Sequence, residues 1–477
     1  MHPKSPKFVP TEAEAALVGQ MVSSFGGTVR LPGSKSITNR ALLVAGLASG
    51  TSQIHNLLDC DDSRYMIDAL TELGVDIKVG DGEPGDPDGI NTGVTGVTEV
   101  TGAGGPFPVK DGTFYLGNAG TTTRFLTAAL AASDGTYRVD GDDRMRARPI
   151  GDLLRGLNVL GAKVRAASNC PPVDIEPATL LGGPINMSGR ISSQFTSAVL
   201  MVSPLARRQV SLRVEGELVS RPYLDLTVQC MRDFGAKVLI YDKTDDGQPR
   251  FEVIPGRGYL ARDFVVEGDA SAASYFYAAA AISGGTVRVE GVGKESRQGD
   301  LRCVEVLAEM GCRVNKEENA VMVTGGILRG VDCNCSDIPD TVPTLAVVGM
   351  FARGRTRLRG VAHLRHKESD RIAALASELG RLGGTVRELK DGLEIDGTSG
   401  TDVELHGADV HPWGDHRIAM ALSIAGLLVP GVAIKEPQVV NKSYPGFFQA
   451  LASLGASVTF ALKGGDSVKV GTNGGPS

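Results

Sequence analysis

The sequence predicts an α/β protein that consists of six copies of one small subdomain, and two recurring patterns carry this prediction. In the first pattern an apolar helical run ends at a glycine, and a short segment of alternating apolar residues follows. Glycine suits the left-handed position that ends a helix, and apolar alternation suits a strand. The period is too long for a solenoid repeat, so each copy must be a small α/β subdomain. The glycines stand 87, 74, 76, 72 and 72 residues apart, at Gly74, Gly161, Gly235, Gly311, Gly383 and Gly455.

A second pattern lies half a copy away, where six further apolar helical runs open on polar clusters at 33–36, 117–121, 192–194, 268–271, 338–341 and 414–417. Taken singly, these clusters are typical N-caps, because Ser, Thr, Asn and Asp accept hydrogen bonds from a first turn. However, four cations lie at or just inside such starts, where the helix dipole disfavours them: Lys35, Arg40, Arg124 and Arg417. Anions bind well at helix starts. Six starts directed at one cleft would therefore bind a small ligand with several negative charges.

The segments between these runs complete the predicted layout. Residues 80–112 are rich in Gly, Pro and Asp, so we expect a long surface insertion there. Within residues 241–262, the run 251–254 predicts a strand before a crossover between two halves of three copies each. The tail from Lys463 onward is rich in Gly and Ser, and we expect it to be loosely held.

Composition excludes several other classes of protein. The chain has 477 residues and a formal net charge of −6, so it lacks the basic field typical of nucleic-acid binding. No apolar run reaches the roughly 18 residues of a membrane span, and the N-terminal residues resemble neither a secretory signal nor a transit peptide. Seven scattered cysteines fit reduced thiols in the cytoplasm and lack the spacing of a zinc site. We therefore expect a cytoplasmic protein with no metal, no nucleic-acid partner and no membrane contact.

Seven segments, in this order along the chain, resemble the 5-enolpyruvylshikimate-3-phosphate synthase family: 31–36 with 39–40, 116–121, 148–152, 191–194, 268–271, 367–371 and 415–420. The resemblance implies the two-domain enolpyruvyl transferase fold, an inside-out α/β barrel with three βαβαββ units per domain and inward helices. It also implies that the N-terminal segment crosses into the second domain. We therefore expect one domain at 34–264 and the other at 1–33 plus 265–477.

The reaction implied by the resemblance transfers the enolpyruvyl group of phosphoenolpyruvate to the 5-hydroxyl of shikimate 3-phosphate and releases phosphate. It belongs to the shikimate pathway of aromatic amino acid biosynthesis. Both substrates carry a phosphate and a carboxylate, which is the ligand character that the helix starts predict. No phosphoryl group is transferred, so we expect no cofactor; a P-loop is ruled out because Glu295 follows Lys294 where that loop has Ser or Thr. The expected partners are these two small molecules, bound by a monomer.

The family's binding residues carry over position by position. For shikimate 3-phosphate the resemblance implies contacts with Lys35, Ser36, Arg40, Ser192, Ser193, Gln194, Ser220, Tyr223, Asp340, His363 and Lys367. For phosphoenolpyruvate it implies contacts with Lys35, Gly120, Arg148, Gln194, Arg371, Arg417 and Lys442. Arginine suits forked contacts with a carboxylate or a phosphate.

Three residues are candidates for the proton transfers. The resemblance implies Asp340 as base for the attacking hydroxyl and Glu368 as proton donor and acceptor at the methylene carbon, with Lys35 as third candidate. Taken alone, Asp340 could be an N-cap after Pro339. Glu368 alone could be half of a solvated i,i+3 pair with Arg371. The whole set of matching residues favours the catalytic interpretation.

Some positions depart from the family pattern, and two rival functions stay open. Thr122, Thr123 and Phe125 stand where many members have Ala, Met and Pro, so we hypothesise an altered response to the inhibitor glyphosate, which resembles phosphoenolpyruvate. His363 stands where Asn is common. The nearer rival is enolpyruvyl transfer to a nucleotide sugar, but its reactive loop cysteine is missing here between residues 118 and 149. The farther rival is a non-catalytic anion-binding protein of the same fold.

Overall fold

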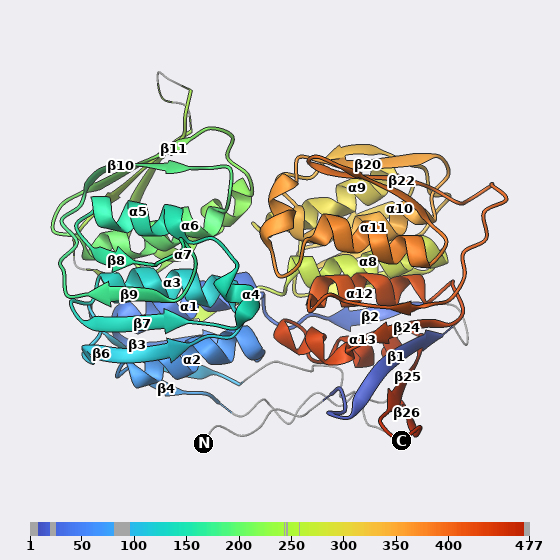
Figure 1. Cartoon of the computed structure of the whole chain (residues 1–477), viewed down its shortest axis with the longest axis horizontal. Helices are drawn as coiled ribbons and strands as arrows, with labels where there is room; N and C mark the ends of the chain where they lie inside the picture. The colour runs from blue at the N-terminus through green and yellow to red at the C-terminus, as the bar shows by residue number, and fades with distance from the viewer. Residues whose placement is uncertain are drawn as a thin grey trace. The chain divides into compact units, whose positions relative to one another are not determined.

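The computed structural model describes residues 8–19, 25–80, 96–242, 244, 247–256 and 258–471. The chain forms two compact units (Figure 1). We call them the middle unit, which holds the described residues of 34–82 and 95–266, and the terminal unit, which holds those of 1–33 and 267–477. The chain passes from one to the other at Gly33–Ser34 and again at Val266–Glu267. None of the described helices is long and apolar enough to cross a membrane.

Three sheets form the middle unit, and they share one topology. In the sheet β6-β7-β9-β8, β6 runs parallel to β7, and β9 runs antiparallel to β7 and β8. The sheet β10-β11-β13-β12 repeats this order. The third sheet, β14-β3-β5-β4, takes its first position from the end of the unit, where β14 and then β15 pair in parallel with β3. Each sheet with its helices is thus one βαβαββ copy.

The bounds of the middle-unit elements follow the chain. The helices are α1 (Lys35–Leu47), α2 (Asp61–Glu72), α3 (Gly120–Ala131), α4 (Asp143–Arg146), α5 (Gly151–Val159), α6 (Ser193–Val202), η1 (Ser203–Leu205) and α7 (Arg221–Asp233). The strands are β3 (Ala48–His55), β4 (Asp76–Lys78), β5 (Thr98–Ala103), β6 (Asp111–Tyr115), β7 (Thr136–Asp140), β8 (Lys163–Arg165), β9 (Val173–Glu176), β10 (Gly183–Ser188), β11 (Val210–Glu215), β12 (Lys237–Tyr241), β13 (Arg250–Ile254), β14 (Tyr259–Leu260) and β15 (Asp263–Val265).

The terminal unit contains three sheets of the same kind, with one variation. The sheets β2-β16-β18-β17 and β19-β20-β22-β21 keep the order seen in the middle unit. In β23-β24-β1-β25-β26, β1 from the N-terminal segment lies antiparallel between β24 and β25. It occupies the place that the last strand of each copy holds elsewhere. The N-terminal segment therefore completes a sheet whose other strands come from the last part of the chain.

The bounds of the terminal-unit elements are as follows. The helices are α8 (Ala270–Ser283), η2 (Gly299–Arg302), α9 (Cys303–Glu309), η3 (Pro339–Thr341), α10 (Val342–Met350), η4 (Ala362–His366), α11 (Arg371–Arg381), α12 (His416–Ala425), η5 (Pro437–Lys442) and α13 (Phe447–Ser453). The strands are β1 (Ala13–Gly19), β2 (Gly26–Arg30), β16 (Thr286–Glu290), β17 (Arg313–Lys316), β18 (Ala320–Thr324), β19 (Asp332–Asn334), β20 (Arg355–Arg359), β21 (Thr385–Leu389), β22 (Gly392–Asp396), β23 (Asp409–Val410), β24 (Val432–Lys435), β25 (Ser457–Leu462) and β26 (Ser467–Lys469).

The six recurring glycines all adopt the conformation that the sequence pattern predicts. Their φ angles lie between 88° and 114°, in the region that L side chains rarely adopt. The helices α2, α5, α7, α9, α11 and α13 each end two residues before the glycine, and the next strand begins two residues after it. The repeated α/β architecture is therefore confirmed.

The other recurring helices form the interior of each unit. Every residue of α3, α10 and α12 is buried, and α1, α6 and α8 are buried except at a few positions near their ends. A helix that is apolar on all faces must be covered on all faces. Accordingly, the sheets lie around these helices in each unit (Figure 1), and each unit has a hydrophobic core of its own. This is the inside-out α/β barrel that the resemblance implies.

Two expected loop regions contain strands. The described part of the expected insertion 80–112 forms β5, which pairs with β3 and β4, and begins β6; residues 81–95 lie outside the described chain. Thr98 and Val100 point inward from β5, so a few buried side chains outweigh its glycine-rich composition. The tail beyond Lys463 pairs through β26 with β25, and residues 472–477 are not described. The strand expected at 251–254 is confirmed as β13.

Candidate active site

The polar clusters at the helix starts cap only some of the inner helices. Ser192 accepts a hydrogen bond from the Gln194 N–H at 3.2 Å, and Asp269 accepts one from Ala272 at 3.0 Å. Asp415 accepts one from the Arg417 N–H at 2.9 Å. The N-cap residues of α1 and α3, by contrast, make no capping bond with their side chains. Ordinary capping therefore explains three of the six clusters.

In the terminal unit, three carboxylates surround one guanidinium. The side chain of Arg371, the first residue of α11, is 1% exposed. Its Nη1 donates to Asp340 Oδ1 at 2.9 Å, its Nη2 to Glu368 Oε2 at 2.8 Å, and its Nε to Asp415 Oδ2 at 2.8 Å. Because both partners are buried, the Glu368–Arg371 contact is not a solvated surface pair.

Two more cations adjoin this group. The Nη2 atom of Arg417, in the first turn of α12, donates to Asp340 Oδ2 at 2.7 Å. Lys442, the last residue of η5, places its Nζ 4.0 Å from Glu368 Oε1. The structure therefore brings together five of the predicted residues of this unit: Asp340, Glu368, Arg371, Arg417 and Lys442.

The electrostatics of Asp340 are dominated by its cationic neighbours. Burial alone would raise the pKa of the Asp340 carboxyl, but Arg417, Lys367 and Arg371 together hold it well below its usual range. Burial disfavours the Arg371 cation, yet its carboxylate neighbours hold its pKa above the usual arginine value. Asp340 and Arg371 are therefore both ionised at neutral pH. A carboxylate held this firmly in the ionised form is a weak proton acceptor.

His363, on η4, is buried beside this group. Burial and then Lys367 lower the pKa of His363 to about 3, so its ring is neutral at physiological pH. Its Nε2 atom is buried and has no hydrogen-bond partner among the described residues. A buried polar atom of this kind has a hydrogen bond to offer to a ligand.

In the middle unit, α1 begins with a buried ion pair. The Lys35 Nζ lies 3.3 Å from Asp62 Oδ2, and both side chains are less than 10% exposed. Asp62 is in the first turn of α2. Asp62 and Asp415 are not among the residues predicted to bind substrate or transfer protons. Asp415 could have been found as the residue before a cationic helix start, whereas Asp62 carries no local signal beyond an acidic first turn.

Arg40 lies one turn along α1 and is engaged from several sides. Its Nε donates to Thr227 Oγ1 at 2.8 Å, its Nη1 to the Ser36 carbonyl at 2.8 Å, and its Nη2 to the Tyr223 carbonyl at 3.1 Å. The guanidinium stacks over Phe125, with 5.1 Å between Cζ and the ring centroid. Burial lowers the pKa of Arg40 to about 10. The contact of Arg40 with the shikimate carboxylate stays a prediction.

Two arginines cover the start of α3. Arg148 Nη1 donates to Asn118 Oδ1 at 2.8 Å, and Arg124 Nη1 donates to the Gly120 carbonyl at 3.0 Å. A Cβ atom at Gly120 would lie 2.5 Å from Arg148 Nη2 and 2.9 Å from Arg124 Nη1. Both guanidinium groups can therefore occupy these positions only because Gly120 has no side chain.

Hydrogen bonds join the helix starts of the middle unit. Thr122 Oγ1 donates to Asn39 Oδ1 at 3.2 Å and lies 3.0 Å from the Asp62 carbonyl, which joins α3 to α1 and α2. Gln194 Nε2 donates to Thr121 Oγ1 at 3.1 Å, which joins α6 to α3. The predicted residues Ser192, Ser193 and Gln194 lie at the start of α6, and Ser220 and Tyr223 lie at the start of α7, which packs against α6. The structure therefore gathers the predicted residues of this unit.

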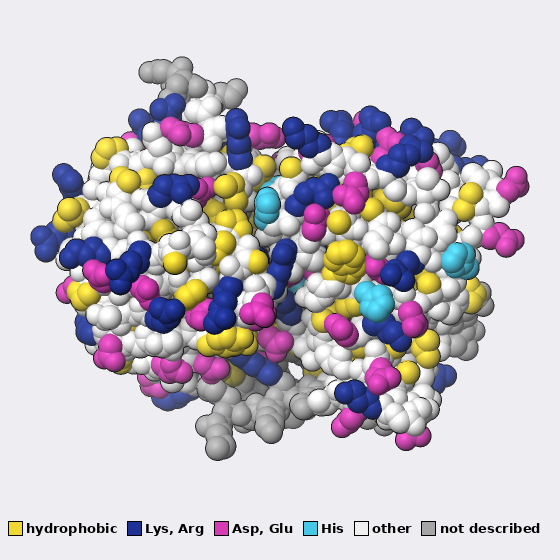
Figure 2. Space-filling model, viewed as in Figure 1, with side chains coloured by type: hydrophobic (Ala, Val, Ile, Leu, Met, Phe, Trp, Pro, Cys, Tyr) yellow, Lys and Arg dark blue, Asp and Glu magenta, His cyan; other side chains and the backbone are white. Residues whose placement is uncertain are grey.

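The buried charges of the middle unit are unequal. Among its described residues, four cationic side chains are buried, Lys35, Arg40, Arg124 and Arg148, and one carboxylate is, Asp62. On the face shown in Figure 2, by contrast, Lys and Arg are interspersed with Asp and Glu. Buried charge is costly unless it is compensated. The interior of this unit therefore favours an anionic ligand. In the part of the chain that the structure covers, no group of three or more His, Cys, Asp or Glu residues could hold a metal ion.

This fold, with cations buried at the starts of its inner helices, defines the enolpyruvyl transferase class. A solved structure of an EPSP synthase from Acinetobacter baumannii superposes with a TM-score of 0.74 at 26% sequence identity. The match covers 94% of this chain and 100% of that one.

The particular family follows from sequence comparison. The model of the EPSP synthase (3-phosphoshikimate 1-carboxyvinyltransferase) family matches residues 20–451. A 3-phosphoshikimate 1-carboxyvinyltransferase from Shewanella loihica is 42% identical over 437 residues, which cover 91% of this chain and 98% of the relative. The chloroplastic enzyme of that name from Brassica napus is 43% identical over 463 residues, covering 93% and 86%. The chain belongs to the EPSP synthase family and is a transferase, as the seven matching segments predict.

Proposed function

We propose that this chain transfers the enolpyruvyl group of phosphoenolpyruvate to the 5-hydroxyl of shikimate 3-phosphate and releases phosphate. Family membership supports the reaction. The observation that carries the ligand assignment is the excess of buried cations over buried carboxylates in the middle unit. Each substrate carries a phosphate and a carboxylate, so the charge of either is opposite to this excess of buried positive charge. No described residue has to hold a metal for this chemistry.

Shikimate 3-phosphate is assigned mainly to the middle unit. The hydroxyls of Ser192, Ser193 and Ser220 suit its phosphate, because a hydroxyl both donates and accepts. Lys35, Ser36 and Arg40 are assigned to its carboxylate, and Gln194 and Tyr223 to the ring. From the terminal unit, Asp340, His363 and Lys367 complete the assignment. The neutral, buried imidazole of His363 supports a hydrogen bond to this substrate rather than an ion pair.

Phosphoenolpyruvate is assigned to cations of both units: Lys35, Arg148, Arg371, Arg417 and Lys442. Gly120 and Gln194 complete its set. The fork geometry of Arg suits a carboxylate or a phosphate. Two guanidinium groups lie so close to Gly120 that a side chain there would displace them. This supports a role for Gly120 in leaving room for the two arginines, rather than in making the backbone flexible.

The proton steps are assigned to Asp340, Glu368 and Lys35. The hydroxyl oxygen attacks C2 of phosphoenolpyruvate and gives its proton to Asp340, while C3 receives a proton from Glu368. Glu368 then takes a proton back from C3, the C2–O bond to phosphate breaks, and phosphate leaves. Arg417, Lys367 and Arg371 hold the pKa of Asp340 low. An anion that shares these arginines would raise the pKa of Asp340 and make it a better base.

The substitution Asp340→Asn tests these assignments. It keeps the size of the side chain and removes the base, so we expect turnover to fall about 10²–10⁴-fold while shikimate 3-phosphate still binds. Asp337→Asn is the matched control, because Asp337 lies three residues upstream and pairs with Arg302 at 3.5 Å, outside the group. Turnover of Asp340→Asn close to that of the control would remove Asp340 from the mechanism.

Assembly and location complete the proposal. We also propose that the chain acts as a monomer. All seven cysteines are free thiols, which supports a reducing cytoplasm. Sedimentation velocity of the purified chain tests the first assignment, and a stable dimer at low micromolar concentration would reject it.

A further inference from the structure

A loop in the terminal unit precedes α12 and carries the one tryptophan of the sequence. It runs from β23 through His411, Pro412, Trp413 and Gly414 to Asp415. Trp413 has a φ angle of 57° and Gly414 one of 67°, so two consecutive residues are left-handed. A tryptophan rarely adopts this conformation without contacts that hold it there.

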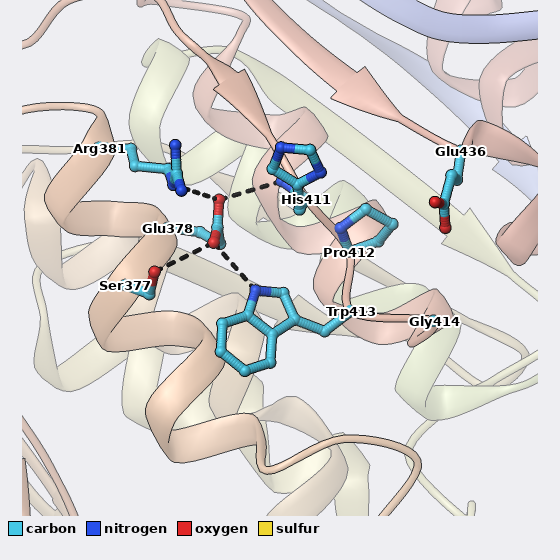
Figure 3. A pocket seen from close by; sticks show the side chains of 8 residues that line it. All are labelled: Ser377, Glu378, Arg381, His411, Pro412, Trp413, Gly414 and Glu436. Atoms are coloured by element: carbon cyan, nitrogen blue, oxygen red, sulfur yellow. Dashed lines mark hydrogen bonds and ion pairs between the residues drawn. The ribbon is translucent and has the colours of Figure 1, made fainter. Parts of the chain in front are cut away.

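One buried carboxylate holds this loop (Figure 3). Glu378 Oε1 accepts a hydrogen bond from the Trp413 indole Nε1 at 2.9 Å, and Oε2 accepts one from the His411 backbone N–H at 3.0 Å. Ser377 Oγ at 3.1 Å and Arg381 Nε at 3.3 Å complete its contacts. The Glu378 side chain is 1% exposed. Both oxygens are therefore occupied by donors, two of which come from the loop.

Glu378 belongs to the helix that begins at Arg371. Seven residues separate the two, which is close to two turns, so both side chains leave α11 on the same side. Asp415, the residue after the loop, reaches back to Arg371 Nε at 2.8 Å. Buried carboxylates thus tie α11 twice to the segment before α12: Glu378 binds the loop, and Arg371 binds Asp415, the N-cap of α12. Arg417 follows in the first turn of α12.

We propose that Glu378 is a positioning residue, which fixes the 411–414 loop and thereby places Asp415 and Arg417 against Arg371 and Asp340. The inference rests on the proposed role of Arg371 and Arg417 in binding phosphoenolpyruvate. Glu378 touches none of the reacting groups. Its effect is therefore expected in the affinity for phosphoenolpyruvate and not in that for shikimate 3-phosphate.

Trp413 offers a direct signal for this contact. Its side chain is nearly half exposed and stands at a hollow of about 420 Å³, lined by residues that include Pro412, Arg381 and Glu436 (Figure 3). Loss of the bond to Glu378 would expose the indole N–H to water and move the emission of this single tryptophan to longer wavelength. Fluorescence therefore reports the loop independently of activity.

The test compares Glu378→Gln with Arg381→Gln, which removes a partner of the same carboxylate outside the loop. An amide accepts hydrogen bonds only at its oxygen, whereas both oxygens of Glu378 accept from the loop. The Glu378→Gln variant must therefore lose the hydrogen bond from either Trp413 or His411. We expect the red-shifted emission and a KM for phosphoenolpyruvate raised about tenfold, with the KM for shikimate 3-phosphate within twofold of wild type. Arg381→Gln should change neither KM. Should Glu378→Gln fail to fold, Trp413→Phe, which removes the indole N–H together with the five-membered ring, should raise the same KM less strongly.

Two results would overturn the proposal. One is a folded Glu378→Gln with shifted emission and an unchanged KM for phosphoenolpyruvate, and the other is an equal rise of both KM values. Arg417→Lys separates this failure from that of the proposed function. If Arg417→Lys leaves phosphoenolpyruvate binding unchanged, the site assignment is wrong; if it weakens binding and Glu378→Gln does not, only the positioning role is wrong.

Discussion

The substitution Gly120→Ala tests whether the lack of a side chain at the start of α3 is needed to position Arg148 and Arg124. The added Cβ would lie 2.5 Å from Arg148 Nη2, 2.8 Å from its Nη1 and 2.9 Å from Arg124 Nη1. Ordinary contact between such atoms is about 3.5 Å, so Arg148 must retreat by about 1 Å. Its Nη1 is held by Asn118 Oδ1 at 2.8 Å, and a retreat of this size breaks that bond or turns the fork.

The expected effect of Gly120→Ala on the free energy of unfolding is smaller than its expected effect on phosphoenolpyruvate binding. The atoms in the way are ends of flexible side chains, and Ala exceeds Gly in helix propensity by about 0.8–1 kcal/mol, so we expect the free energy of unfolding to change by no more than about 1 kcal/mol. One charge-assisted bond to phosphoenolpyruvate is worth about 1.5–3 kcal/mol, so its KM should rise about 10–100-fold.

Steady-state kinetics with varied phosphoenolpyruvate, and urea unfolding of the same samples, measure both quantities. Gly380→Ala on α11 is the matched control, because a Cβ there meets nothing within 4 Å. It should stabilise the protein slightly and leave KM unchanged. An unchanged KM in Gly120→Ala, or a loss of stability of several kcal/mol, would show that Gly120 does not position the two arginines for phosphoenolpyruvate.

Three further predictions concern other parts of the molecule. Phe125→Pro should change the inhibition constant of glyphosate, because it alters the first turns of α3 and removes the ring beneath Arg40; an unchanged constant rejects the hypothesis. Gly311→Ala should lower the free energy of unfolding by more than about 1 kcal/mol, since the new Cβ would lie 2.5 Å from the Ile327 carbonyl oxygen at a φ of 114°; urea unfolding measures it, and a neutral result contradicts the assigned backbone. The pKa of Asp340 lies below its unfolded value of about 3.8, so its stabilisation is complete above that pH and is lost as the pH falls. Stability should therefore fall less steeply below pH 4 in Asp340→Asn than in wild type, and parallel curves would contradict this.

Local chemistry explains why much of the fold could be predicted. At Gly161 or Gly383, for example, the left-handed residue ends a helix, and the next strand begins two residues on. Both events depend on a few neighbouring residues, which the sequence displays. The insertion of β1 between β24 and β25 depends on segments more than 400 residues apart. No local pattern signals this pairing, and the resemblance implied only that the segment crosses over.

The candidate site, like the fold, could be predicted from the sequence only where it depends on neighbouring residues. Cations at helix starts are visible in sequence, and Lys35, Arg124 and Arg417 are buried there as the dipole argument expects of ligand-binding residues. Most protein partners of the site cations were not foreseen. Asp62 beside Lys35, and Asp340 and Asp415 beside Arg371, are brought together by packing between separate elements. Glu368, three residues before Arg371, is the partner that the sequence displays. The strand β5 was hidden in the same way, because its pairing outweighs its composition.

Release of phosphate from phosphoenolpyruvate by the purified chain is the direct test of the proposed reaction. The measurement is made with shikimate 3-phosphate, with a nucleotide sugar, and with no acceptor. We expect one phosphate for each shikimate 3-phosphate consumed, and none in the other two reactions. Release with the nucleotide sugar alone, or equal release without any acceptor, would contradict it.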